Sequence, residues 1–142
     1  MTIAAILRNK GDEVVTVTAD QPLGDVVRLL AERRIGAVPV MDGGAVAGIF
    51  SERDVIYRLA EEGPAALERK VGEVATRPAL TVDKDTPILS ALALMTKRRI
   101  RHLPVVEGER LIGLVSIGDL VKLRIERVEA EAEAMRHYIA GN

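Results

Sequence analysis

Cysteine is absent from this chain of 142 residues, which excludes disulfide bonds, thiolate metal sites and a cysteine nucleophile. Aromatic residues are nearly absent, with no tryptophan, one phenylalanine and two tyrosines, so the chain lacks a stacking platform for single-stranded nucleic acid. It has only two histidines, no Gly-x-Ser-x-Gly motif and no metal-ligand spacing. We therefore expect no catalytic residues, no metal site and no enzymatic activity.

An excess of charge is also missing. Twenty Lys and Arg residues are balanced by 21 Asp and Glu residues, so the net charge is −1 and a nucleic-acid partner gains no electrostatic support. No apolar run approaches the roughly 20 residues that span a bilayer, and the segment 1–8 is too short for a signal peptide. The sequence predicts a cytoplasmic protein without a membrane partner.

What the chain does contain is a repeat. Thr16 matches Thr81 and Asp54 matches Asp119, and both pairs are 65 residues apart (81 − 16 and 119 − 54). Each copy contains, in order, Arg-Arg-Ile, Pro-Val, two separated glycines and Ser-x-x-Asp. A single copy would be only marginally stable by itself, so we expect the two copies to share an interface.

The local patterns predict the same order of elements in each copy: a strand, a helix, a two-stranded hairpin and a second helix. In the first copy these are strand 14–17, a helix that begins near Pro22, strands 37–41 and 45–50, and helix 52–62. In the second they are strand 79–82, helix 87–99, strands 103–106 and 111–115, and a helix from about residue 117. This order predicts an α+β fold.

Breaks in the pattern divide the chain into four parts: residues 1–64 (first repeat with an N-terminal helix), 65–78 (linker), 79–125 (second repeat) and 126–142 (helical extension). The final helix carries apolar residues at heptad-like spacing: Val121, Ile125, Val128, Ala132, Met135 and Ile139. Two interpretations stay open. The stripe packs on its own domain, or it pairs with a second copy in a homodimer.

The Ser-x-x-Asp motif stands at the start of a predicted helix in both copies, as Ser51 to Asp54 and Ser116 to Asp119. A capping box, in which serine and acid satisfy free backbone N–H groups, accounts for both residues and is the interpretation that the residues alone favour. The same geometry also suits a ligand. A helix N-terminus attracts phosphate, and a carboxylate one turn later can accept hydrogen bonds from the two hydroxyls of a ribose.

The copies differ at one position that bears on chemistry. Arg101 and His102 in the second copy replace Gly36 and Ala37 of the first. Arginine offers several donors to phosphate oxygens, and histidine can add another. The alternative is a solvated loop cation beside a half-buried histidine. Either way, two sites built from these copies would not carry equal positive charge.

Several segments together resemble a known family. These are Arg-Ile-Gly-Ala-Val-Pro-Val and Val-Ala-Gly-Ile-Phe-Ser-Glu-Arg-Asp-Val in the first copy, and Ile-Arg-His-Leu-Pro-Val-Val and Leu-Ile-Gly-Leu-Val-Ser-Ile-Gly-Asp-Leu in the second. Over roughly residues 3–123 the chain is similar to a tandem pair of CBS (cystathionine β-synthase) domains, also called a Bateman module. The resemblance implies two β-α-β-β-α units packed by their sheets with pseudo-twofold symmetry.

In that family, two clefts between the units commonly bind AMP, ADP, ATP, S-adenosylmethionine or related compounds, and the Asp of the motif holds the ribose. The resemblance implies a first cleft formed by Ile49, Ser51, Asp54, Ala79, Leu80, Arg101 and His102. There, Asp54 would hold the ribose, Ser51 and the Arg101-His102 pair would meet phosphate, and the aliphatic side chains would enclose adenine. The implied second cleft combines Leu114, Ser116 and Asp119 with Val14, Val15, Gly36 and Ala37, without the cationic pair.

The resemblance also implies a role. We expect a stand-alone regulatory module with an adenine nucleotide as its regulatory ligand, no required cofactor and a homodimeric assembly. The alternative is a protein–protein interaction module whose clefts stay empty. Family members are often fused to the proteins that they regulate, and we expect this chain to act without such a fusion.

Overall fold

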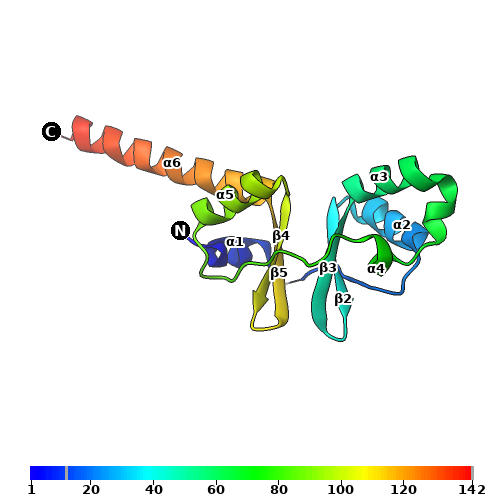
Figure 1. The fold of residues 1–142 in the computed structure, drawn as a ribbon. Helices are drawn as coiled ribbons and strands as arrows, with labels where there is room; N and C mark the ends of the chain where they lie inside the picture. Colours follow the sequence, from blue (N-terminus) through cyan, green and yellow to red (C-terminus); the bar gives the residue numbers. More distant parts are fainter. Residues whose placement is uncertain (12, 142) are drawn as a thin grey trace.

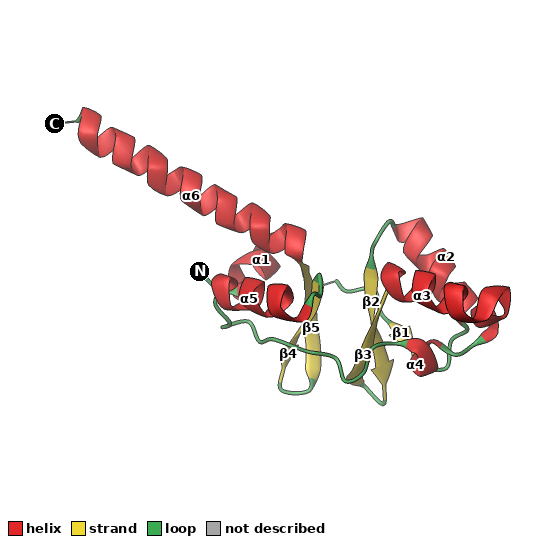
Figure 2. Ribbon diagram, turned by 45° about the horizontal axis from the view of Figure 1, so that its top comes forward, coloured by secondary structure: helices red, strands yellow, loops and turns green. Residues whose placement is uncertain are grey.

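The structure is a computed structural model that describes residues 1–11 and 13–141. It consists of two similar halves side by side, with the strands of both halves at the centre and the helices outside (Figures 1 and 2). The first half contains β1 (Val17–Thr18), α2 (Leu23–Arg33), β2 (Ala37–Asp42), β3 (Ala45–Ser51), α3 (Glu52–Glu62), the 3₁₀ helix η1 (Gly63–Glu68) and α4 (Val71–Val74). The second contains α1 (Ile3–Lys10), α5 (Ile88–Arg98), β4 (His102–Glu107), β5 (Arg110–Ser116) and α6 (Ile117–Ala140). The fold is α+β, and the repeat appears in both halves.

Each half is organised around an antiparallel hairpin that the sequence predicted closely. In the first hairpin, Asp42 pairs with Ala45 across Gly43 and Gly44, whose φ angles of 60° and 84° lie in the left-handed region that glycine tolerates. The second hairpin repeats this register, with Glu107 opposite Arg110. Strands β3 and β5 contact each other where the halves meet.

Each half has its own apolar core beneath the hairpin. The predicted helix after Pro22 is α2, where Leu23, Val26 and Leu30 are buried against Phe50. The core of the second half gathers around Met95, Leu103 and Leu120. Among the described residues no polar or charged residue is fully buried, so hydrophobic burial dominates both cores.

The segments that lead into the two repeats cross to the opposite half. Residues 1–4 lie along residues 84–88, with the Ile3 N–H donating to the Thr86 carbonyl over 3.0 Å, and Ile3 and Ile6 join the second core. In the same way the Val71 N–H donates to the Gln21 carbonyl over 2.8 Å, and α4 joins the first core. The N-terminal helix therefore packs with the second half, although it precedes the first repeat in the sequence.

Two predicted strands are wrong in extent. Strand 14–17 is reduced to β1, because only Val17 and Thr18 pair with β2 and the chain before them leaves the sheet edge. Predicted strand 79–82 contributes a single bridge, between Val82 and Val105. Apolar composition suggested a strand in both places, but only the last residues reach a partner.

The final helix, α6, extends well beyond the body of the molecule (Figure 1). Leu120 in its first turn is buried, but five members of the heptad-like stripe are 41–68% exposed: Val121, Ile125, Val128, Met135 and Ile139. The stripe therefore does not pack on its own domain. In the part of the chain that the structure describes, no helix is both long enough and apolar enough to cross a membrane.

Candidate functional site

Both Ser-x-x-Asp motifs form capping boxes. The Ser51 N–H donates to Asp54 Oδ2 over 2.9 Å, and the Asp54 N–H donates to Ser51 Oγ over 3.4 Å. The corresponding distances at Ser116 and Asp119 are 2.8 and 3.1 Å. The cap that the residues favoured is present, and each box fixes the position of its carboxylate at the start of a helix.

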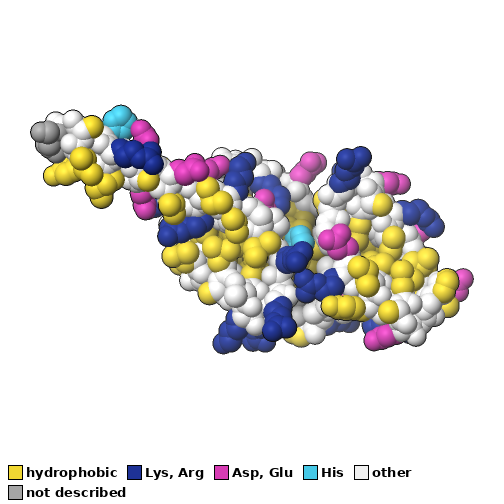
Figure 3. Space-filling view, turned by 90° about the horizontal axis from the view of Figure 1, so that it is seen from above, with side chains coloured by type: hydrophobic (Ala, Val, Ile, Leu, Met, Phe, Trp, Pro, Cys, Tyr) yellow, Lys and Arg dark blue, Asp and Glu magenta, His cyan; other side chains and the backbone are white. Residues whose placement is uncertain are grey.

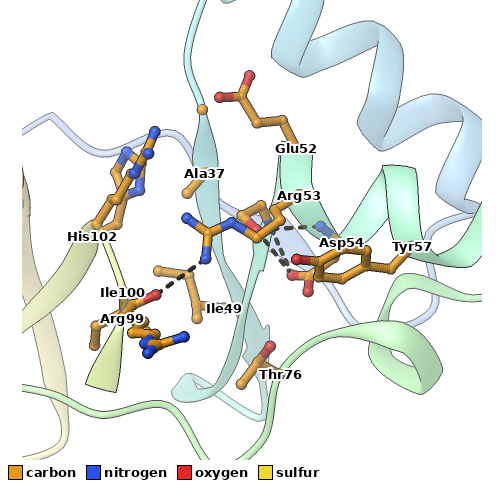
Figure 4. Close-up of a pocket in the computed structure, with 13 residues that line it drawn as sticks. Ala37, Ile49, Glu52, Arg53, Asp54, Tyr57, Thr76, Arg99, Ile100 and His102 are labelled. Carbon is orange, nitrogen blue, oxygen red and sulfur yellow. Dashed lines mark hydrogen bonds between the residues drawn. The ribbon is translucent and has the colours of Figure 1, made fainter. Parts of the chain in front are cut away.

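Asp54 borders a cavity of about 230 Å³ between the two halves, which we call the first cleft. This is slightly below the range of about 300–1,000 Å³ that is typical of ligand pockets. Its walls come from β2, β3, α3, the linker and the segment before β4 (Figure 4). The lining residues are Gly36, Ala37, Ile49, Ser51, Glu52, Arg53, Asp54, Tyr57, Thr76, Arg99, Ile100, Arg101 and His102.

Three arginines from both halves surround the first cleft: Arg53, Arg99 and Arg101. Arg53 reaches across the junction, and its Nη1 donates to the Arg99 carbonyl over 3.1 Å (Figure 4). Viewed from above, Lys and Arg side chains gather at the junction between the halves (Figure 3). Glu52 and Asp54 line the same cavity, so the three guanidinium groups leave it with a small excess of positive charge and supply the donors that phosphate oxygens need.

His102 stands between the two clefts and lines both. Its ring lies against Gly36, where an added Cβ would come within 3.3 Å of Cε1. Burial, and after it the charge of Lys10, lowers the pKa of His102 below 6.5, although Glu52 and Asp119 oppose the shift. His102 is therefore neutral at neutral pH, and the positive charge expected of the Arg101-His102 pair comes from Arg101 alone.

The second cleft is a cavity of about 310 Å³. It is lined by Lys10, Glu13, Val14, Val15, Ile35, Gly36, Ala37, His102, Leu114 and Ser116. Six of the seven residues that the sequence analysis assigned to this cleft lie on its wall. The exception is Asp119, which is not among the lining residues.

Asp119 has a partner that Asp54 lacks, namely Lys10. Lys10 Nζ donates to Asp119 Oδ2 over 2.8 Å and to the Leu114 carbonyl over 3.0 Å. Burial alone would raise the pKa of Asp119, but hydrogen bonds from Lys10 and from the Ser116 backbone outweigh it and hold this pKa below 3.8. The second carboxylate therefore already has a cation as its partner.

In the first cleft the structure brings together five of the seven expected residues: Ile49, Ser51, Asp54, Arg101 and His102. Ala79 and Leu80 are not among its lining residues, and Leu80 packs against the second core. Thr76 stands on the wall instead, because its backbone pairs with Ile49 at the edge of β3. The linker thus enters the cleft a few residues earlier than expected.

Sequence reasoning did not identify Arg53, Tyr57 or Arg99 as residues of the cleft. The sequence did contain one indication of Arg53. Arg53 occupies a variable position of Ser-x-x-Asp, where the second copy has Gly118, so the comparison that identified Arg101 also applies there. Arg99 gave no such signal, because the first copy has Arg34 at the same position.

A family model supports what the repeat and the fold indicate. The model of the CBS domain matches residues 7–61 and again residues 71–126. The chain belongs to the CBS-domain family. Its two repeats form a CBS-domain pair.

Several known proteins are similar to this CBS-domain pair. A CBS-domain protein of Agrobacterium tumefaciens, ATU1752, has a crystal structure with a TM-score of 0.83 and 39% identity, covering 87% of this chain and 92% of that one. The mitochondrial CBS-domain protein CBSX3 of Arabidopsis thaliana is 34% identical over 99% of this chain and 72% of its own length. The CBS-domain pair of protein MJ0100, in complex with 5-methylthioadenosine and S-adenosyl-L-methionine, is 23% identical with a TM-score of 0.79, covering 89% of this chain and 98% of that one.

Proposed function

We propose that this protein is a regulatory sensor that binds an adenine nucleotide in the first cleft. The observation that carries the proposal is the position of Asp54. Its carboxylate is fixed by the capping box, borders the cavity and faces a group of arginines from both halves. A ribose diol at Asp54 would place an attached phosphate within reach of guanidinium donors.

The charge of the cleft favours one group of ligands within the adenine class. Arg53, Arg99 and Arg101 outnumber the carboxylates of Glu52 and Asp54, and this excess of positive charge suits the phosphates of AMP, ADP or ATP better than the cationic sulfonium of S-adenosylmethionine. The apolar part of the wall, from Ala37, Ile49 and Ile100, would enclose the base. The bound adenosine derivatives of MJ0100 support this ligand class through the shared fold alone.

A sensor also needs two states that a ligand distinguishes. A ligand in the first cleft would contact both halves, because Asp54 belongs to α3 and Arg101 precedes β4. Binding would therefore favour the relative position of the halves in which both sets of contacts are made. The proposed role is regulatory and non-catalytic, in the cytoplasm, and requires no cofactor.

The exposed stripe on α6 supports a homodimer as part of this proposal. Five apolar side chains at heptad-like spacing stay in solvent in the single chain, and a second copy would cover them. Light scattering should give a dimer for the wild type and a monomer for Ile125→Glu. Ala130→Glu, which adds the same charge to another side of α6, is the matched control, and a dimer that survives Ile125→Glu would contradict the assignment.

The same stripe favours the second candidate function, an interaction module whose clefts stay empty and whose helix docks another protein. Thermal-shift measurements with AMP, ATP, NAD and S-adenosylmethionine separate the two candidates. A ligand that binds the folded state at 100 times its Kd stabilises the protein by about 2.7 kcal/mol and raises its Tm. A Tm unaffected by all four compounds would favour the interaction module.

The role of Asp54 is tested by two substitutions that separate capping from binding. Asp54→Ala removes both the cap and the charge, whereas Asp54→Asn keeps an oxygen that can accept from the Ser51 N–H. We expect Asp54→Asn to retain most of the stability but to lose AMP binding in calorimetry. Asp25→Asn on the surface of α2 is the control. AMP affinity equal to the wild type in Asp54→Asn would contradict the proposed function.

A further inference from the structure

The carboxylates of the two motifs differ in their partners. In the first cleft Asp54 is accessible from the cavity, whereas beside the second cleft Asp119 is bound by the cation of Lys10. Helix α1 continues to Lys10, and the amine of Lys10 lies between Asp119 Oδ2 and the Leu114 carbonyl. These two acceptors come from the helix start and the strand that border the second cleft. Lys10 is 109 residues from Asp119 in the sequence, so only the fold brings them together.

The equivalent contact in the first half has a different donor. There α4 ends at Val74, the chain continues in an extended form, and the Thr76 N–H donates to the Ile49 carbonyl over 2.9 Å. Ile49 corresponds to Leu114, so both strand carbonyls are satisfied, one by a backbone N–H and the other by Lys10. Lys10, whose side chain is 43% exposed, therefore satisfies the carbonyl that corresponds to the one satisfied by the Thr76 N–H in the first half.

The consequence falls on the two carboxylates. In the described part of the chain, the hydrogen bonds to the Asp54 carboxylate come from the backbone and hydroxyl of Ser51, so its outer side faces the cavity. Asp119 accepts from Ser116 and also from Lys10, and it borders a separate hollow of about 220 Å³ beside α6. A ribose diol cannot replace the Lys10 ammonium at Oδ2 without separating a charge-assisted pair.

We propose that Lys10 closes the ribose subsite of the second cleft, so that each chain binds one adenine nucleoside, in the first cleft. This rests on the proposed function. It makes Lys10 a specificity-determining residue, because it decides which of two similar carboxylates is available to a ligand. Loss of the Lys10 contact would convert the protein from one site to two.

Calorimetry with adenosine tests this, because adenosine has the diol but no phosphate that could itself attract Lys10. We expect one site per chain in the wild type and in Lys10→Arg, which keeps the charge, and two sites in Lys10→Met. The second site should disappear again in the double variant Lys10→Met with Asp119→Asn. Lys97→Met, a change of an exposed lysine on α5, is the matched control and should keep one site.

The outcomes separate the two proposals. One Asp54-dependent site in both the wild type and Lys10→Met contradicts the role of Lys10 and leaves the proposed function standing. A second site that is present in the wild type and lost in Lys10→Met also contradicts it, because Lys10 would then hold ligand. No adenosine or AMP binding in any variant contradicts the proposed function and the inference with it.

Discussion

In the first cleft, Asp54 borders an open cavity with three arginines on its walls, whereas in the second cleft Asp119 is bonded to Lys10 and lies outside the cavity. Both carboxylates belong to capping boxes of nearly the same geometry. What differs is the set of residues that come from distant parts of the chain. Lys10 of α1 contacts Asp119, and the residue before β2 is Gly36 where the residue before β4 is Arg101. A repeated motif thus reproduces local structure, while neighbours distant in the sequence decide its chemistry.

Among the substitutions that make the two clefts more alike, the largest expected effect comes from removing the charge of Arg101. Arg101 corresponds to Gly36, so Arg101→Ala makes the first cleft resemble the second. Loss of a charged hydrogen bond costs about 1.5–3 kcal/mol, which is a fall in AMP affinity of about 10- to 150-fold. Adenosine affinity should change much less.

Calorimetry with both ligands checks this prediction, and Arg98→Ala in the last turn of α5 is the control. Equal losses for AMP and adenosine would mean that Arg101 does not meet phosphate.

The second comparison concerns the glycines where the crossing segments approach the strands. An added Cβ at Gly48 would lie 2.7 Å from the Thr76 carbonyl, which is backbone, while one at Gly113 would meet only the flexible end of the Leu7 side chain. Overpacking costs about 1–3 kcal/mol where the neighbour cannot move. Urea denaturation should therefore show that Gly48→Ala is more destabilising than Gly113→Ala. The reverse order would contradict the account of the two crossings.

Removing either helix cap should lower the free energy of unfolding by a smaller amount, and the two losses should be equal. Ser51→Ala and Ser116→Ala each remove the hydroxyl that accepts from the N–H of an aspartate three residues later. Each should lower the free energy of unfolding by about 1 kcal/mol, and Thr at either position should restore most of it. The measurement is chemical denaturation. A marked difference between the two serines would show that the motifs do not act as equivalent caps.

The smallest effect concerns pH. Because burial lowers the pKa of His102 in the folded state, the unfolded chain takes up a proton more readily, and stability falls as pH decreases below about 6.5. Asp119 acts in the same direction at lower pH, below about 3.8. Between pH 7 and pH 5, thermal unfolding of His102→Gln should depend less on pH than that of the wild type.

His137→Gln removes the other histidine, near the end of α6, and controls for the loss of an imidazole. A pH dependence that is unchanged in His102→Gln would contradict the burial argument.

The sequence sufficed for features that depend on neighbours along the chain. Helix 52–62 and the hairpin of strands 37–41 and 45–50 were predicted closely, because helix caps and glycine turns leave local signals. The 65-residue offset also predicted which residues of the two copies would correspond. The unequal charge at Gly36 and Arg101 followed directly from that comparison.

The rest depended on contacts that no local pattern encodes. The crossing of α1 to the second core, and with it the contact of Lys10 with Asp119, is set by packing between distant segments. Val14 and Val15 have the β-branched character of a strand, but the sheet edge ends at Val17. Their place on the wall of the second cleft was implied by the family resemblance and not by the local pattern. The pKa of His102 likewise depends on burial against the other half.

The most direct test of the central claim is a calorimetric titration of AMP into Asp54→Asn and Asp119→Asn, beside the wild type. These variants make the same chemical change in two similar capping boxes, and Asp119→Asn also weakens the ion pair with Lys10, so the stability of each variant is measured beside its affinity. The account predicts one site per chain that is lost in Asp54→Asn and retained in Asp119→Asn. Binding that survives in Asp54→Asn, or that is lost equally in both variants, would contradict it.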